Sequence, residues 1–164
     1  MGFNVQGIAI SKKYDTAQKL ADTIGLGIIE KVGDKYFEEA SSSMIDDNDI
    51  YITELKNGTI VTLGSSFDIQ EIALNNASEE GKAIRFMVGE TSMAFAFEYL
   101  LNGQSVRTIF NAEGENMMEE GEPLEMETNE SDMTEIIFSL IGDVTGDSFY
   151  SIEPDQKSEH YRQI

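Results

Sequence analysis

The side chains with the greatest capacity for chemistry in this 164-residue sequence are carboxylates, and they are concentrated in one segment. Positions 111–135 read "NAEGENMMEEGEPLEMETNESDMTE" and hold ten Asp and Glu residues but no Lys or Arg. Carboxylates grouped in this way can bind hard cations, work as a catalytic pair or contact a basic partner. Because like charges repel one another and favour water, "EGENMMEEGEPLE" predicts a solvated loop that leads to a strand at 124–128.

The alternative for this segment is contact with a basic protein. Four glutamates are the candidate contact residues, namely Glu115, Glu119, Glu120 and Glu122. Met117 and Met118 lie beside them and would add an adaptable apolar contact. A catalytic pair of the glycosidase kind needs two particular carboxylates, and the sequence does not single out two.

Two shorter segments carry oxygen ligands of the kind that Ca²⁺ and Mg²⁺ prefer. The first is "DDND", with Asp46, Asp47 and Asp49, and the second is "GDVTGD", with Asp143 and Asp147. Neither has the spacing of an EF-hand loop. Either set could serve a divalent-metal-dependent enzyme if its carboxylates converged in a pocket, and otherwise each segment is a solvated loop.

Other catalytic arrangements have little support. The sequence has no Cys, and its one histidine, His160, lies close to the last residue, where chains are usually mobile. A hydroxyl nucleophile needs a positioned base, so most nucleophilic triads are excluded, and no glycine-rich phosphate-binding loop is present. We therefore predict no cofactor, apart from the cation sites above.

The overall charge limits the partners further. There are 31 Asp and Glu residues against 11 Lys and Arg, which gives a formal net charge of −20. Nucleic acids and anionic membrane surfaces bind clusters of basic side chains, so we expect neither as a partner. No apolar run reaches the length of a membrane span and the N-terminus lacks the features of a secretory signal, so we expect a soluble, cytoplasmic protein.

Three segments have the apolar periodicity of amphipathic helices. They are "YDTAQKLADTIG", "SSFDIQEIALNNASEEG" and "SDMTEIIFSLIG". Asp15, Ser65 and Asp132 lie at their starts, and Gly25, Gly81 and Gly142 at their ends.

Strands account for most of the remaining sequence. Asn57-Gly58 and Asn102-Gly103 predict two hairpins, and Phe95, Phe97 and Tyr99 alternate along one of them as core candidates. Further strands are expected at 3–10, 28–32 and 83–88. The order of elements predicts one α+β domain over 1–150, with three helices covering one face of an antiparallel sheet of six to eight strands. The C-terminal tail over 151–164 is predicted to be loose or to lie as a strap against the sheet.

Two parts of the sequence share a spacing that an internal β-α-β duplication would explain. Gly25, Ile28, Val32 and Gly33 are spaced as Gly81, Ile84, Val88 and Gly89 are, and each set follows a predicted helix. The alternative is that both segments follow the general pattern of a β-α-β unit.

The segment "FEYLLNGQSVRTI", followed at a distance by "EEGEPLEME", resembles small uncharacterised bacterial domains, some of them similar to immunity proteins that block secreted toxins. This resemblance implies a non-catalytic interaction protein, which suits the negative charge. We therefore expect a binding protein that engages a basic partner. The alternatives are the carboxylate-based, divalent-metal-dependent enzyme, and a homodimer formed through hairpin edge strands.

Overall fold

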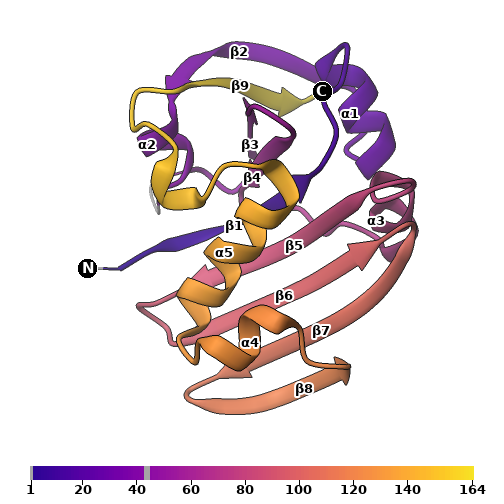
Figure 1. Ribbon diagram of the computed structural model, residues 1–164. Helices are drawn as coiled ribbons and strands as arrows, with labels where there is room; N and C mark the ends of the chain where they lie inside the picture. Colours follow the sequence, from indigo (N-terminus) through magenta and orange to yellow (C-terminus); the bar gives the residue numbers. More distant parts are fainter. Residues whose placement is uncertain (1, 43–44) are drawn as a thin grey trace.

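A computed structural model describes residues 2–42 and 45–164, and its central feature is one sheet of nine strands (Figure 1). The strands are β1 (Asn4–Ile10), β2 (Ile29–Tyr36), β3 (Asp49–Glu54), β4 (Thr59–Leu63), β5 (Lys82–Gly89), β6 (Ala94–Leu101), β7 (Gln104–Ala112), β8 (Glu115–Gly121) and β9 (Lys157–Gln163). They lie in the order β2-β9-β3-β4-β1-β5-β6-β7-β8, and all neighbours are antiparallel. The predicted α+β class is confirmed, with one strand more than expected.

Within the described residues, five α-helices and one 3-10 turn accompany the sheet. They are α1 (Ala17–Ile24), α2 (Phe37–Ala40), α3 (Glu71–Ala77), α4 (Glu125–Asn129), α5 (Met133–Thr145) and the turn η1 (Phe149–Ser151). The three predicted helices exist. The short helices α2 and α4 were not predicted, because a segment of one turn cannot show a repeating apolar pattern.

Helix α5 has the clearest local signals. The Asp132 carboxylate accepts a hydrogen bond from the Glu135 N–H and caps its first turn. The helix continues past Gly142 and ends at Gly146, whose backbone is left-handed. Val144 is buried in this last turn, so packing against the sheet extends the helix beyond the first glycine.

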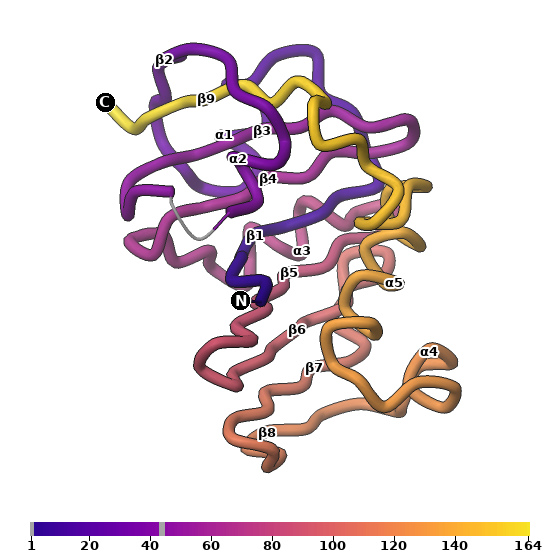
Figure 2. The backbone as a smooth tube through the Cα atoms, turned by 90° about the vertical axis from the view of Figure 1, so that its left-hand side faces the viewer, coloured from indigo at the N-terminus to yellow at the C-terminus, as the bar shows by residue number. Residues whose placement is uncertain are grey.

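The helices cover both faces of the sheet, not one face as the sequence predicted. On one face α2, α5 and η1 pack over a core that includes Phe86, Phe97 and Phe138. On the other face α1 and α3 pack over a second core that includes Ile8 and Ile50. Figure 2 shows α4 and α5 together on one side of β6, β7 and β8.

The strands at the centre of the sheet explain this arrangement. Strand β1 ends in Ile8, Ala9 and Ile10, and all three are completely buried. Every residue of β4 is buried as well. Continuous apolar runs are typical of strands covered on both faces, whereas alternation is typical of strands with one face in water. The sequence "GIAI" therefore contained the signal for a second layer of helices.

The last residues form part of the sheet. Residues 151–164 were predicted to be a tail, but β9 lies between β2 and β3 and pairs with both. Its buried residues include Ser158, His160 and Tyr161. Strand β9 has few apolar residues, so its sequence gives no apolar pattern by which an inner strand could be predicted.

The suggested duplication does not match the positions of the strands. Strand β2, which contains Val32 and Gly33, is at one edge of the sheet, whereas β5, which contains Val88 and Gly89, is next to the central strand β1. The two segments with the same spacing are therefore not equivalent in the fold.

Candidate functional site

The acidic segment forms an edge strand, so the prediction of a solvated loop was wrong. Glu115, Glu119 and Glu120 lie on β8, the outermost strand on one side of the sheet, and Glu122 follows directly after it. All seven residues of β8 are exposed. An edge strand with both faces in contact with water needs no apolar alternation, which is why its composition resembled that of a loop.

A tight turn brings β8 alongside β7. Glu113 and Gly114 both have left-handed backbones, with φ of 53° and 83°, as a two-residue type I′ turn requires. Asn102 and Gly103 form the same kind of turn between β6 and β7, as predicted. Glu-Gly is a weaker turn signal than Asn-Gly because glutamate favours this conformation less.

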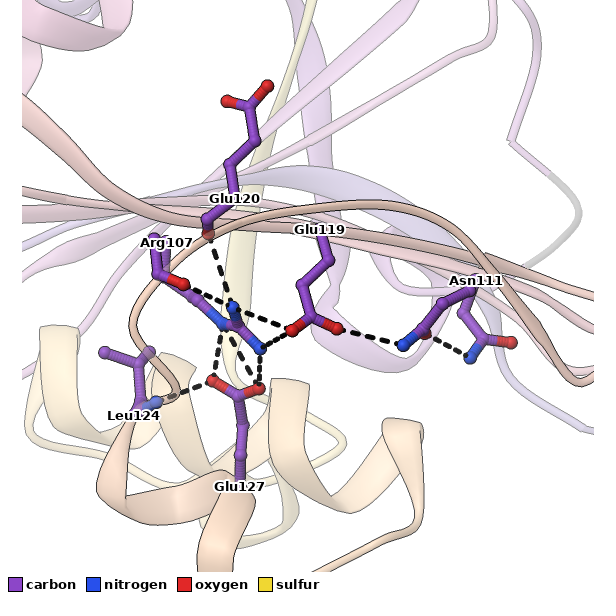
Figure 3. Close-up of polar contacts among 8 residues, drawn as sticks. Arg107, Asn111, Glu119, Glu120, Leu124 and Glu127 are labelled. Atoms are coloured by element: carbon purple, nitrogen blue, oxygen red, sulfur yellow. Dashed lines mark hydrogen bonds and ion pairs between the residues drawn. The ribbon is translucent and has the colours of Figure 1, made fainter.

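Arg107 lies at the centre of a polar cluster beneath the acidic strand (Figure 3). Its side chain is only 2% exposed. Its Nε and Nη2 atoms donate to the two carboxylate oxygens of Glu127, at 3.0 and 2.6 Å. Its Nη1 donates to the Gly121 carbonyl oxygen at 2.7 Å, and Glu119 approaches it to 3.4 Å.

This cluster holds β8 and α4 together. The Glu127 carboxylate, 11% exposed, also accepts from the Leu124 N–H at 2.7 Å, which caps α4 where the sequence predicted a strand at 124–128. Hydrogen bonds from Arg107 to Glu127 raise the pKa of the guanidinium, so the ion pair stays charged. A regular hairpin at Asn102-Gly103 would place Val106 opposite Tyr99, and a β-bulge next to Leu100 brings Arg107 to that position instead, so the sequence contains no direct signal for this site.

The four predicted contact residues differ in how they are held. Glu119 points towards Arg107 and also accepts from the Asn116 side chain, so part of its charge is balanced internally. Figure 3 shows the Glu120 side chain pointing away from Arg107. Three of them, Glu115, Glu120 and Glu122, are exposed. The basic residue nearest to them along the sequence is Arg107. The structure brings all four to one edge of the sheet.

The opposite face of the same strands contains a cavity. A cavity of about 290 Å³ is lined by side chains that include Phe67, Met87, Phe110 and Met118. Phe97 and Ile109, their neighbours along β6 and β7, belong to the core under α5. In the described part of the chain, α3 is the helix that contacts β5 from the cavity side, and β7 and β8 have no helix over them there.

At the first predicted cation site, the Asp49 carboxylate already accepts hydrogen bonds from groups of the protein. The Asp49 carboxylate accepts from His160 Nε2 at 2.8 Å, Arg162 Nε at 3.1 Å and the Asp46 N–H at 3.1 Å. Burial opposes its ionisation, but these hydrogen bonds outweigh burial and hold the pKa of Asp49 below its usual range. Asp47 turns to another group, the Ser65 hydroxyl. Asp46 and Asp49 both face Arg162, at 3.8 and 3.1 Å, and only Asp47 turns away from them.

The second predicted pair is also separated. Asp143 accepts from the Tyr99 hydroxyl at 2.6 Å and pairs with Lys82 at 3.1 Å. Asp147 accepts from the Lys56 N–H in the β3–β4 turn. Within residues 2–42 and 45–164, no three His, Cys, Asp or Glu side chains are grouped as metal ligands.

The only histidine has a place in the sheet. His160 is buried, and its ring stacks on that of Tyr51 at 4.5 Å between centroids. Together with its bond to Asp49, this contact fixes β9 against β3. Burial is the main reason that the pKa of Tyr51 is raised to about 12, with Asp49 adding to the effect. The sequence suggested a mobile terminal residue, because pairing of β9 could not be seen.

Comparisons with known proteins add no assignment. No protein-family model, curated protein or solved structure matches this chain. Among the described residues, no helix has both the length and the apolar character needed to cross a bilayer.

Proposed function

We propose that this protein is a non-catalytic binding protein whose acidic edge, defined as β8 and Glu122, engages a basic protein partner. The observation that supports this proposal most directly is that the acidic edge carries negative charge with no exposed basic residue of the same segment to balance it. Glu115, Glu120 and Glu122 are exposed at this edge, while Arg107, the last base before them, is buried and paired with Glu127. Their charge is therefore available to a partner.

The rigidity of the edge favours specific binding over general attraction. The acidic edge is paired along β7 and is tied to α4 through Arg107, so its backbone is already ordered before a partner arrives. Ordering in advance lowers the entropy that association costs. The net charge of −20 extends the attraction beyond contact distance and speeds encounters with a basic protein.

Two methionines give the acidic edge an apolar component. Met117 is 61% exposed and Met118 is 47% exposed, and both lie between Glu115 and Glu119. Met side chains adapt their shape to the surface that they contact, so they suit a site where apolar and charged contacts alternate. The resemblance to immunity proteins favours a basic domain of a toxin as the partner.

The proposal can be tested with two charge-matched variants. In the edge variant, Glu115→Lys, Glu120→Lys and Glu122→Lys reverse three charges at the acidic edge. In the control variant, Glu30→Lys, Glu79→Lys and Glu153→Lys reverse three exposed charges elsewhere. Proteins retained from an extract of the source cells by the wild type and the control, but not by the edge variant, are then purified.

Association rates with a retained protein decide the outcome. We expect the edge variant to associate about tenfold more slowly than the control at low ionic strength, and the difference to shrink as salt screens the charges. If the two variants associate at the same rate at low salt, or if no retained protein distinguishes them, the acidic edge is not the binding site.

A further inference from the structure

On the cavity side of the sheet, an apolar row of side chains crosses strands β5 to β8. The register pairs Met87 with Ala96, Ala96 with Phe110, and Phe110 with Met118, so these four residues lie side by side on consecutive strands. All four line the cavity of about 290 Å³, and Phe67 borders it. The row begins next to β1 and ends at the acidic edge.

Carboxylates stand on both sides of this apolar row. On one side, the neighbouring row on the strands contains Glu98, Thr108 and Glu120, with Arg85 on β5. Arg85 is already engaged, because it donates to the Ile69 carbonyl oxygen and pairs with Glu98. On the other side of the apolar row, Glu115 of β8 lies opposite Ala112 of β7. The apolar row is thus flanked by net negative charge.

The backbone of the sheet limits what can dock on this face. The peptide groups of β6 and β7 bond within the sheet and are not available to a segment lying on its face. A segment docked there must satisfy its own backbone groups, which a helix does and an extended strand does not. The same chain uses this solution on the other half of the face, where α1 and α3 pack on the sheet.

The dimensions and the charge specify the helix. Four adjacent strands span about 14 Å, which corresponds to roughly ten helical residues at about 1.5 Å each. Apolar side chains spaced i, i+3, i+4 and i+7 would contact the apolar row, and Lys or Arg beside them would reach Glu115 or Glu120. A second copy of this chain brings the same carboxylates to the interface, so charge disfavours it.

We infer that the apolar row and its flanking carboxylates form the docking site for a basic amphipathic helix of the protein partner. This inference rests on the proposed function, since it takes the basic partner as given and specifies how that partner binds. Helix-in-groove recognition of this kind places apolar anchors in the cavity and basic residues at the rim.

Two synthetic peptides of identical Leu and Lys composition test the inference. In one peptide the leucines form a single helical face, and in the other they are distributed evenly, so that both carry the same charge. Binding is followed by NMR of protein labelled in its methionine methyl groups. We expect the amphipathic peptide to shift the Met87 and Met118 signals, while Met126 and Met133, which pack on the α5 side, stay unchanged.

Substitution within the apolar row provides a second measurement. Ala96→Lys fills the cavity and adds one positive charge, and Gln104→Lys, at an exposed position of β7, adds the same charge elsewhere. We expect Ala96→Lys to weaken binding of the amphipathic peptide about tenfold relative to Gln104→Lys.

The outcomes separate this inference from the proposed function. If both peptides bind equally without shifting Met87 or Met118, the docking site is overturned, while the acidic edge can still bind basic chains. If Met87 and Met118 shift on raising the protein concentration alone, the occupant is a second copy and the inference is wrong. If the edge variant binds both peptides as well as its control variant does, the proposed function fails.

Discussion

Arg107 shows how one residue can organise a surface of opposite charge. It is buried under β8 and α4, and it binds the Glu127 side chain of α4 and the Gly121 backbone carbonyl of β8. Removing only one partner of a buried ion pair leaves an unpaired charge, which is far more costly than losing an exposed pair. The order of the acidic edge therefore depends on a cation that no partner can reach.

Replacing this residue tests that dependence. We expect Arg107→Met to lower the free energy of unfolding by about 3 kcal/mol, because Glu127 is left buried without its donors. The measurement is equilibrium unfolding in urea. Lys19→Met is the control, since the side chains of Lys19 and its partner Asp15 are 64% and 86% exposed and their ion pair should contribute less than about 1 kcal/mol.

A double variant separates the charge from the packing. Arg107→Met with Glu127→Leu removes both partners, so part of the lost stability should return. Equal losses in Arg107→Met and Lys19→Met would contradict the importance of the cluster.

Individual residues were predicted well where chemistry and position agreed. Phe97 and Tyr99 are buried and Phe95 packs against them, because alternation along a strand shows directly which side chains share a face. The predicted cation ligands were chosen by type alone. Asp49 meets His160 and Arg162 only after β9 has joined β3, and contact across more than 100 positions leaves no local signal.

At the scale of elements, the edge strand β8 and the inner strand β9 were the hardest to predict. Strand β8 has no apolar alternation because both of its faces are exposed, and β9 has little because its inward groups include Ser158 and His160. The helices α1 and α5 were predictable, since each has an apolar face of two turns or more. Pairing in the sheet, not local propensity, determines the two strands.

Strand β9 can be tested by a single proline. Glu159 pairs with Asp34 on β2 and Ile52 on β3, so its N–H lies within the sheet. We expect Glu159→Pro to lower the free energy of unfolding by about 3 kcal/mol or more, because proline cannot donate and its ring disturbs the neighbouring strand. Circular dichroism during urea unfolding provides the measurement.

Glu159→Ala is the matched control for this prediction. It removes a partly exposed ion pair with Lys31 and a long hydrogen bond from the Tyr161 hydroxyl, and should cost less than about 1 kcal/mol. A loose tail would tolerate both changes. Similar urea-unfolding midpoints for Glu159→Pro and Glu159→Ala would therefore contradict the position of β9 as an inner strand.

For the whole molecule, the dominant physical property is the imbalance of charge. Ten carboxylates fall between Glu113 and Glu135. They lie in or next to β8, α4 and the start of α5, so charge repulsion is strongest in this part of the fold. Net charge far from zero destabilises a compact state, and dissolved ions weaken that repulsion. The composition revealed this property from the sequence alone, whereas the position of the charge at a sheet edge required the fold.

Salt should therefore stabilise the protein. We expect the unfolding temperature to rise by several degrees between about 10 mM and about 500 mM NaCl, as the Debye length falls from about 30 Å to a few Å. Calorimetry provides the measurement. The edge variant, with three Glu→Lys changes within this cluster, should show a smaller rise, and an unfolding temperature independent of salt in the wild type would contradict the expectation.

The position of β9 also has a consequence for the order of events during synthesis. A ribosome makes β2 and β3 long before it makes β9, yet these two strands are separated in the finished sheet by that late strand. Until residues 157–163 have left the ribosome, β2 has no neighbour and one side of β3 is open to any passing strand. A chaperone that holds the nascent chain would act during this interval, and a translational pause before these codons would lengthen it.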